Sequence, residues 1–179
     1  AYGGSCFPKD TKGLVSAGEK CKINLSIVKS VIKSNQARVN LLTNRISKIL
    51  GSNLKNKKIS FLGVTFKPNT DDMRDSTSLK MIPFLCKKGA IVNYYDPSGK
   101  KKEFSRLKNC TYTKSVKESC ADADLVILLT EWDEFKNINF NQVFKKNKFK
   151  IYDLRNLYDP GQMKKNNIKY FSIGRSSAI

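Results

Sequence analysis

Short apolar runs alternate with amphipathic segments from residue 57 to the end of the chain. Each run suits one strand, and turn-forming residues such as those at 96–99 separate the segments. Strands are predicted at 59–64, 90–95, 125–129, 149–153 and 168–173, and helices at 76–88, 101–108, 115–120 and 141–146. Continuously apolar strands that alternate with helices are typical of a parallel sheet covered on both faces. The pattern predicts a Rossmann-like α/β domain, with 51–57 as the one plausible domain boundary.

Before this domain, residues 24–50 carry one long amphipathic pattern. Apolar side chains recur there at helical spacings of three and four, at Ile27, Val28, Val31, Ile32, Val39, Leu42, Ile46 and Ile49. Asn24 can cap the start of this helix and Gly51 can end it. The apolar stripe must pack on something, and either its own domain or a second copy of the chain can cover it.

The chain opens on a glycine-flanked cysteine, which is interpreted as part of a loop. Gly3 and Gly4 have no Cβ, so the backbone there can approach a ligand closely and bring Cys6 to it. A positive charge on Lys9 favours the thiolate, the nucleophilic form of cysteine. Asp10 is a candidate general base or water-orienting carboxylate. The same residue types are ordinary turn formers, so they fit an idle thiol as well.

Charged residues follow two predicted strands at the edge where open α/β sheets bind ligands. The connection at 65–75 is longer than the ~2 to 6 residues usual between a strand and a helix, which is typical of functional loops. It carries Lys67 and Arg74, and Arg155 follows a later strand. These cations suit an anion, although solvated surface ion pairs are the simpler interpretation of any one of them. The connection lacks a G-x-G-x-x-G fingerprint, so it is not a standard dinucleotide site.

The formal net charge of +19 raises the question of a nucleic-acid partner. The cations are 28 lysines and 6 arginines, spread through every segment. Because base reading and bidentate phosphate recognition depend on arginine, no nucleic-acid partner is predicted. The charge still favours anionic ligands such as a pyrophosphate. No apolar run reaches the roughly 20 residues that span a bilayer, so no membrane partner is predicted either.

The chain has five cysteines and no histidine, and these counts bear on whether metal sites and disulfides are expected. No C-x-x-C pair is present, so neither a metal site nor a disulfide framework is predicted, and reduced thiols fit a cytoplasmic protein. Cys86 and Cys120 lie in apolar patterns and are expected to be small core residues. Cys6 is the one cysteine in a reactive setting.

Four separate segments, in the same order, resemble the UDP-glucose/GDP-mannose dehydrogenase family. They are 3–10, 66–76, 130–132 and 153–160, and the third carries no assigned role. In that family the cysteine matching Cys6 is the covalent nucleophile, and a separate N-terminal domain holds NAD. The resemblance implies that 1–52 comprises the catalytic cysteine loop and part of a central helical domain through which the enzyme dimerises. It implies that 53–179 is a C-terminal, Rossmann-like UDP-sugar-binding domain.

The resemblance also implies roles for single residues. Cys6 and Asp10 would be catalytic, and Lys9 and Arg74 would contact NAD. The implied substrate-binding residues are Tyr2, Gly3, Gly4, Ser5, Phe66, Lys67 and Arg155. The implied partners are UDP-glucose or a related nucleotide sugar, and a second copy of the chain bound through the 24–50 helix.

The reaction implied is the NAD-dependent oxidation of the sugar's C6 alcohol to a carboxylate, through a thiohemiacetal and a thioester on Cys6. The opening motif is closer to the UDP-glucose branch than to the N-acetylmannosamine branch, although GDP-mannose or another UDP-hexose stays open as substrate. The family's N-terminal domain is not found in these residues, so the chain is expected to be the C-terminal part of an enzyme that does not turn over alone. The residues also fit a non-catalytic nucleotide-sugar-binding module, or a basic domain that binds polyanions.

Overall fold

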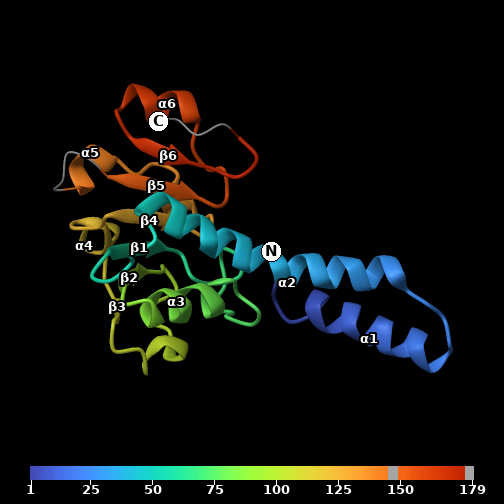
Figure 1. Ribbon diagram of the computed structural model, residues 1–179. Helices are drawn as coiled ribbons and strands as arrows, with labels where there is room; N and C mark the ends of the chain where they lie inside the picture. The colour runs from blue at the N-terminus through green and yellow to red at the C-terminus, as the bar shows by residue number, and fades with distance from the viewer. Residues whose placement is uncertain (145–148, 176–179) are drawn as a thin grey trace.

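The computed structural model describes residues 1–144 and 149–175, as a helical hairpin attached to an α/β domain (Figure 1). The hairpin consists of α1 (Phe7–Lys20) and α2 (Ser26–Leu50). The strands are β1 (Lys58–Leu62), β2 (Ile91–Tyr95), β3 (Cys110–Tyr112), β4 (Leu125–Leu128), β5 (Lys150–Asp153) and β6 (Lys169–Phe171). The other helices are α3 (Ser78–Lys87), α4 (Val116–Cys120), α5 (Phe140–Val143) and α6 (Pro160–Lys165), with 3-10 turns at Lys102–Phe104 and Asp133–Phe135.

The strands form one six-stranded sheet in the order β3-β2-β1-β4-β5-β6, and every neighbouring pair is parallel. Successive side chains of a strand point to opposite faces. Phe61 therefore joins a core that includes α2 and α3, whereas Leu62 joins a second core that includes α4, α5 and α6. The strand order reverses between β1 and β4. This arrangement confirms the predicted Rossmann-like domain, and it puts the sheet's switch point at the ends of these two strands.

Helix α2 belongs to both parts of the molecule. Its C-terminal half packs on the α/β domain, where Val39 and Ile46 are buried. Its N-terminal half projects beyond the domain and lies against α1 (Figure 1). Ile27 is 81% exposed on this projecting half, and Leu41 is 65% exposed further along the helix. Part of the predicted apolar stripe is thus covered by the chain's own domain, and part of it is not.

Several local predictions were wrong. The opening segment is not a loop beyond Cys6 but enters the helix α1, in which Pro8 occupies the first turn. Leu25, not Asn24, is the N-cap residue of α2, whereas Gly51 ends that helix as predicted. The segment 101–108 forms a single 3-10 turn rather than a helix, and it leads into the edge strand β3, which was not predicted. Helix α6 was also missed, and the end of the predicted 141–146 helix lies outside the described residues.

None of the helices in the described part of the chain is long and apolar enough to cross a membrane.

Alkaline pH is expected to destabilise this fold. Burial raises the pKa of Tyr94 to about 12, and burial together with the carboxylate of Asp153 raises the pKa values of Tyr158 and Tyr170. The folded chain holds these protons more tightly than the unfolded chain, so the stabilisation is complete below the ordinary tyrosine value of 10.0 and is lost as pH rises above it. Denaturant unfolding at stepwise pH should show stability falling above about pH 10. Full phenolate absorbance in a still folded protein near that pH would contradict this expectation.

Candidate functional site

An open cleft lies at the switch point of the sheet, beyond the carboxyl ends of β1, β4 and β5. Its lining includes Gly3 from the opening segment, Phe66, Leu129 and Arg155 from the three loops, and Arg38 from α2. The empty space within it measures about 480 Å³, counting the part open to solvent. Two arginines therefore line a cleft where open α/β sheets bind ligands.

Arg155, on the loop after β5, contacts the loops that follow β1 and β4. Its Nε donates to the carbonyl of Leu129 at 2.9 Å, and its Nη2 donates to the carbonyl of Phe66 at 3.2 Å. The carboxylate of Glu131 lies 2.7 Å from the same Nε. The side chain of Arg155 remains 32% exposed, so part of its hydrogen-bonding fork is open to a ligand. The sequence analysis predicted Arg155 as a binding residue but gave Glu131 no role. The position of Glu131 shortly after a strand was a signal in the sequence that could have pointed to it.

The turn that carries Arg155 is fixed by Asp153, the last residue of β5. Asp153 is fully buried, and its Oδ1 accepts from the backbone N–H of Arg155 at 2.8 Å. Its Oδ2 accepts from the N–H of Leu157 at 2.7 Å and from the hydroxyl of Tyr170 at 2.7 Å. A buried carboxylate satisfied in this way is rigid, so it presents Arg155 in one orientation.

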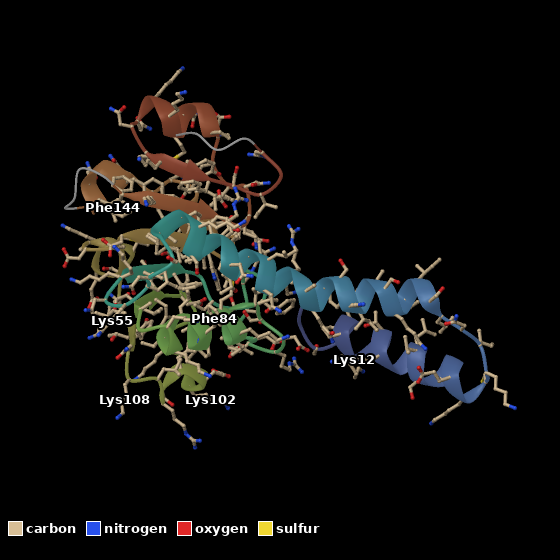
Figure 2. All side chains as sticks on the ribbon, in the orientation of Figure 1. Lys12, Lys55, Phe84, Lys102, Lys108 and Phe144 are labelled. Atoms are coloured by element: carbon tan, nitrogen blue, oxygen red, sulfur yellow. The ribbon has the colours of Figure 1, made fainter. Side chains whose placement is uncertain are left out.

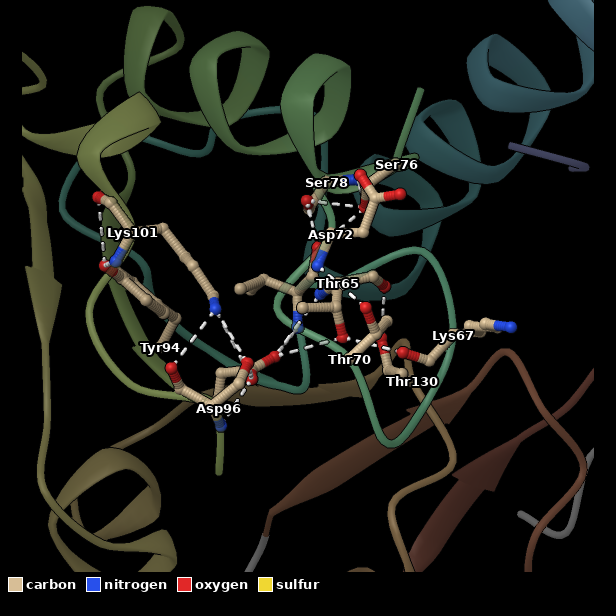
Figure 3. Close-up of polar contacts among 12 residues, drawn as sticks. Thr65, Lys67, Thr70, Asp72, Ser76, Ser78, Tyr94, Asp96, Lys101 and Thr130 are labelled. Carbon is tan, nitrogen blue, oxygen red and sulfur yellow. Dashed lines mark hydrogen bonds and ion pairs between the residues drawn. The ribbon is translucent and has the colours of Figure 1, made fainter. Parts of the chain in front are cut away.

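A second buried carboxylate, Asp96, anchors the loop after β1 (Figure 3). Its Oδ2 accepts from the N–H of Val64 at 2.7 Å and from that of Thr65 at 3.3 Å. Its Oδ1 accepts from the N–H of Ser98 at 3.0 Å and lies 4.0 Å from the Nζ of Lys101, which is itself buried. Asp96 was predicted only as part of a turn. In a dinucleotide-binding domain an acidic residue at this point holds the ribose, but here the protein's own backbone occupies it.

The opening segment meets the same loop. The N–H of Gly4 donates to the carbonyl of Arg74 at 2.8 Å. A Cβ on Gly3 would lie 2.4 Å from the carbonyl oxygen of Asp75, and one on Gly4 would lie 2.8 Å from the Phe66 ring. Gly4 also has a φ of +84°, which side-chain-bearing residues rarely adopt. The two glycines therefore allow a close approach to the chain's own loop, and the predicted approach to a ligand stays a prediction.

The residue before these glycines is fixed by α2. The backbone of Tyr2 donates to the side chain of Asn35 at 2.8 Å and accepts from it at 3.1 Å. The Tyr2 ring meets the Phe7 ring edge to face, with 4.7 Å between the centroids. These contacts hold the start of α1 against α2, and sequence reasoning did not anticipate Asn35.

Cys6 is exposed at the N-cap position of α1, and its Sγ lies 3.5 Å from the hydroxyl of Ser5. Unpaired backbone N–H groups at a helix N-terminus favour negative charge. Lys9 and Asp10 are exposed on the first turn and pair with each other at 3.2 Å. Cys6, Lys9 and Asp10 do not contribute to the lining of the switch-point cleft. The structure therefore gathers the three predicted residues on one helix turn but leaves them outside the cleft.

The remaining predicted cations lie on the loop after β1. Arg74 and Asp72 form an ion pair with 2.8 Å between Nη2 and Oδ2. Hydrogen bonds from Arg74 lower the pKa of Asp72. The same hydrogen bonds and the negative charge of Asp72 raise the pKa of Arg74, and Cys6 raises it by a smaller amount. Lys67 is exposed, and its Nζ lies 5.5 Å from the centroid of the Phe66 ring. In Figure 3 its side chain points away from Asp96 and the groups that Asp96 binds. Both cations are accessible to an anion.

Lysines lie on both the helical hairpin and the α/β domain. Figure 2 shows Lys12 on the hairpin and Lys55, Lys102 and Lys108 at separate places around the α/β domain. Within 1–144 and 149–175, no group of three or more His, Cys, Asp or Glu side chains could hold a metal ion. The switch-point cleft is lined by two arginines, Arg38 and Arg155, and is therefore a candidate anion site.

These features define a Rossmann-like α/β protein with a cationic cleft at the switch point of its sheet. Residues 60–160 match the family model of the UDP-glucose/GDP-mannose dehydrogenase family, UDP binding domain, and residues 1–37 match the central domain of the same family. The chain therefore belongs to the UDP-glucose/GDP-mannose dehydrogenase family. The division of the chain at residue 52 stays a prediction.

Relatives with curated names agree with this assignment. The UDP-glucose 6-dehydrogenase of Rickettsia felis is 39% identical over 97% of this chain and 39% of that protein, and that of Rhizobium meliloti is 35% identical over 97% and 40%. The solved UDP-glucose dehydrogenase of Pyrobaculum islandicum is 27% identical and matches 98% of this chain and 38% of that one, with a TM-score of 0.82. The chain spans about two fifths of the length of the curated relatives it matches.

Proposed function

We propose that this chain is the UDP-sugar-binding part of an NAD-dependent UDP-glucose 6-dehydrogenase. The observation that carries the proposal is the switch-point cleft, where Arg155 and Phe66 meet the segment that leads into Cys6. Relatives named UDP-glucose 6-dehydrogenase that align over nearly the whole chain support the choice of sugar nucleotide. They also favour this activity over a module that only binds nucleotide sugars.

The cleft suits a nucleoside diphosphate. Arg155 offers a planar fork of N–H donors, and such a fork matches the geometry of a phosphate. Arg38 supplies a second cation from α2, and the Nζ of Lys67 lies 5.5 Å from the centroid of the Phe66 ring, beside a residue that lines the cleft. In this proposal the backbone and ring of Phe66 contact the nucleotide, and Gly3 and Gly4 let the opening segment lie close to the sugar.

The chemistry is assigned to Cys6 and Asp10. The thiolate of Cys6 adds to the C6 aldehyde and gives the anion of a thiohemiacetal, which becomes a thioester when its carbon loses a hydride. Water then adds to the thioester carbon, the C–S bond breaks, and the products are the uronic acid and the free thiol. Asp10 takes the proton from that water, and Tyr2 and Ser5 flank the sugar.

The α/β domain itself does not fit a dinucleotide, because Asp96 is occupied by the backbone of Val64 and Thr65 and no G-x-G-x-x-G turn follows β1. NAD supplies the hydride acceptor of both oxidations when it is bound. Lys9 on α1 and Arg74 on the loop after β1 are exposed cations that would contact it where another part of the enzyme holds it. A cofactor held elsewhere agrees with a chain that spans only part of its relatives.

We also propose that a second copy of the chain covers the exposed side of α2. Ile27 and Val31 are 81% and 43% exposed on the projecting half of this helix, and Phe7 and Leu14 are more than half exposed on α1. Large apolar side chains gathered on one hairpin are typical of a surface that another protein covers.

Titration with UDP tests the nucleotide site. The chain is expected to bind UDP at physiological salt, and Lys67→Ala is expected to weaken binding about 3- to 10-fold because an exposed lysine contributes roughly one screened phosphate contact. Lys108→Ala is the matched control, because Lys108 is an exposed lysine on another part of the domain (Figure 2), and it should bind UDP normally.

The dependence of affinity on salt concentration distinguishes a UDP site from a polyanion-binding surface. A single diphosphate site should lose affinity modestly as salt rises, whereas a polyanion-binding surface that replaces many counterions should lose it steeply. No UDP binding, together with steeply salt-dependent binding of heparin that Lys67→Ala and Lys108→Ala weaken equally, would overturn the proposed function.

A further inference from the structure

The opening segment runs between two clefts. Gly3 lines the switch-point cleft, whereas Tyr2 lines a second one, the hairpin cleft, which lies between α1, α2 and the start of α3. Ala1 lines both. The empty space in the hairpin cleft measures about 660 Å³, counting the part open to solvent. The segment is therefore not enclosed on the side of Tyr2, and its position depends on its hydrogen bonds.

Asn35 supplies two of these hydrogen bonds, one to each side of the Tyr2 backbone. Its Oδ1 accepts from the N–H of Tyr2 at 2.8 Å, and its Nδ2 donates to the carbonyl oxygen of Tyr2 at 3.1 Å. A side-chain amide carries both the acceptor and the donor that this pair needs. Two positions further on, the N–H of Gly4 donates to the carbonyl of Arg74 at 2.8 Å. The segment that leads to Cys6 is thus held by α2 on one side and by the loop after β1 on the other.

The helix that carries Asn35 also carries a cation of the nucleotide site. Arg38 lines the switch-point cleft and follows Asn35 by three positions, so both side chains lie on the same face of α2. In a nucleotide sugar, the covalent skeleton limits the distance from the diphosphate to the C6 atom of the sugar. One helix that holds both the cation and the anchor of the cysteine segment can match that distance, because helices place side chains more exactly than loops do.

We propose that Asn35 is a positioning residue, which acts through the Tyr2 backbone to place the Cys6 segment where the sugar of a bound nucleotide sugar reaches the thiol. The inference rests on the proposed function, because it needs the nucleotide part in the switch-point cleft. Without Asn35 the segment moves into the empty space beside Tyr2, so the thiol and the sugar separate while the diphosphate keeps its arginines. A purely structural role would lower stability and leave the sugar's contact in the folded chain unchanged.

Protection of Cys6 from alkylation by UDP-glucose tests the proposal. The folded chain is treated with limiting iodoacetamide, with and without UDP-glucose, and peptide mass spectrometry gives the alkylation rate of each cysteine. UDP-glucose is used at about ten times the dissociation constant of the protein under test. Alkylation of Cys6 in the wild type should then slow about tenfold, because that is the factor by which free sites are depleted.

Asn35→Ala should lose most of this protection and keep the nucleotide site. Protection of Cys6 is expected to fall below about threefold, because both hydrogen bonds to Tyr2 are lost. The affinity for UDP should stay within about twofold of the wild-type value, because Asn35 does not line the switch-point cleft. Asn40→Ala is the matched control: Asn40 is an exposed asparagine on the same helix that lines neither cleft, and this variant should keep full protection.

Cys120 reports on unfolding in the same experiment. It is fully buried, so it is alkylated only when the chain opens, and its rate should be the same in Asn35→Ala and in the wild type. Faster alkylation of Cys120 and Cys6 together, with UDP-glucose still protecting the folded fraction, would assign Asn35 to stability alone and overturn the inference. If Asn35→Ala does not fold, Asn35→Asp takes its place, because it keeps the acceptor for the Tyr2 N–H and loses the donor.

Two further results would overturn the inference and leave the nucleotide site in place. One is full protection of Cys6 in the folded Asn35 variant. The other is a wild-type chain that binds UDP but gains no protection of Cys6 from UDP-glucose. A wild-type chain that binds no UDP would instead overturn the proposed function, on which the inference rests.

Discussion

Replacing Asp96 with alanine is expected to lower the free energy of unfolding by about 3 to 5 kcal/mol, the range seen when one partner of a buried ion pair is removed. Asp96 has no exposed surface, and its carboxylate accepts from the N–H groups of Val64 and Ser98 at 2.7 and 3.0 Å. Alanine would leave these donors and the buried ammonium of Lys101 without the carboxylate. Guanidinium unfolding followed by circular dichroism measures the loss.

The control for this substitution is an aspartate with an exposed ion pair. Asp133 lies 2.6 Å from the Nζ of Lys136, and its side chain is 79% exposed. Asp133→Ala should change stability by no more than about 0.5 kcal/mol, because solvent screens such pairs. A loss at Asp96 no larger than that at Asp133 would show that the buried cluster does not hold the loop after β1.

A double-mutant cycle with Lys101 gives the coupling between the two buried charges. Lys101→Met removes the ammonium and keeps much of the aliphatic volume. If the cost of Asp96→Ala comes largely from an uncompensated buried cation, the double variant should be more stable than the sum of the two single losses predicts. Additive losses would instead assign the cost to the backbone N–H groups that Asp96 accepts from.

The central strands could be predicted because burial on both faces selects a continuous apolar run. β4 is such a run, with all four of its residues buried, and the last four residues of β1 are buried as well. β3 could not be predicted in the same way, because it is three residues long, lies at the edge and contains Thr111 facing solvent. Its strand conformation depends on pairing with β2, which the local sequence does not encode.

Helix α1 was missed for a related reason. Its sequence contains glycines at 13 and 18 and mostly polar residues, so its apolar period is weak. A Cβ on Gly18 would lie 2.8 Å from the side chain of Leu25, which shows how closely the helix and the turn into α2 approach each other. Packing against α2 stabilises α1, and that packing could not be read from residues 7–20 alone.

The candidate site also contains residues that the local sequence could predict and residues that depend on contacts between distant parts of the chain. Arg155 was found because a cation directly after a strand reaches the ligand-binding edge wherever that strand lies in the sheet. Asp153 and Glu131 contact Arg155, Arg38 shares its cleft, and Asp96 anchors the loop after β1, so these four residues come from four different parts of the chain. Asp96 anchors a loop 32 positions earlier in the chain. Such a partnership depends on the order of the strands, which the hydrophobic pattern leaves open.

The second large effect is expected at Arg155. Arg155→Ala should weaken UDP binding about 10- to 100-fold, since a hydrogen bond between charged groups contributes roughly 1.5 to 3 kcal/mol. Isothermal titration calorimetry measures the change. Arg106→Ala is the matched control, because Arg106 is an exposed arginine that does not line the switch-point cleft, and its affinity for UDP should stay at the wild-type value.

Arg155 also binds the carbonyls of Leu129 and Phe66, so a lost structural contact must be distinguished from a lost ligand contact. Arg155→Lys keeps the charge but loses the planar fork that reaches both carbonyls. If the fork binds phosphate, the lysine variant should lose about 5- to 20-fold in affinity, between the wild type and alanine. If Arg155 only joins the loops, both variants should lower the unfolding temperature and leave the affinity of the folded fraction unchanged. Unchanged affinity in a stable Arg155→Ala variant would remove Arg155 from the proposed site.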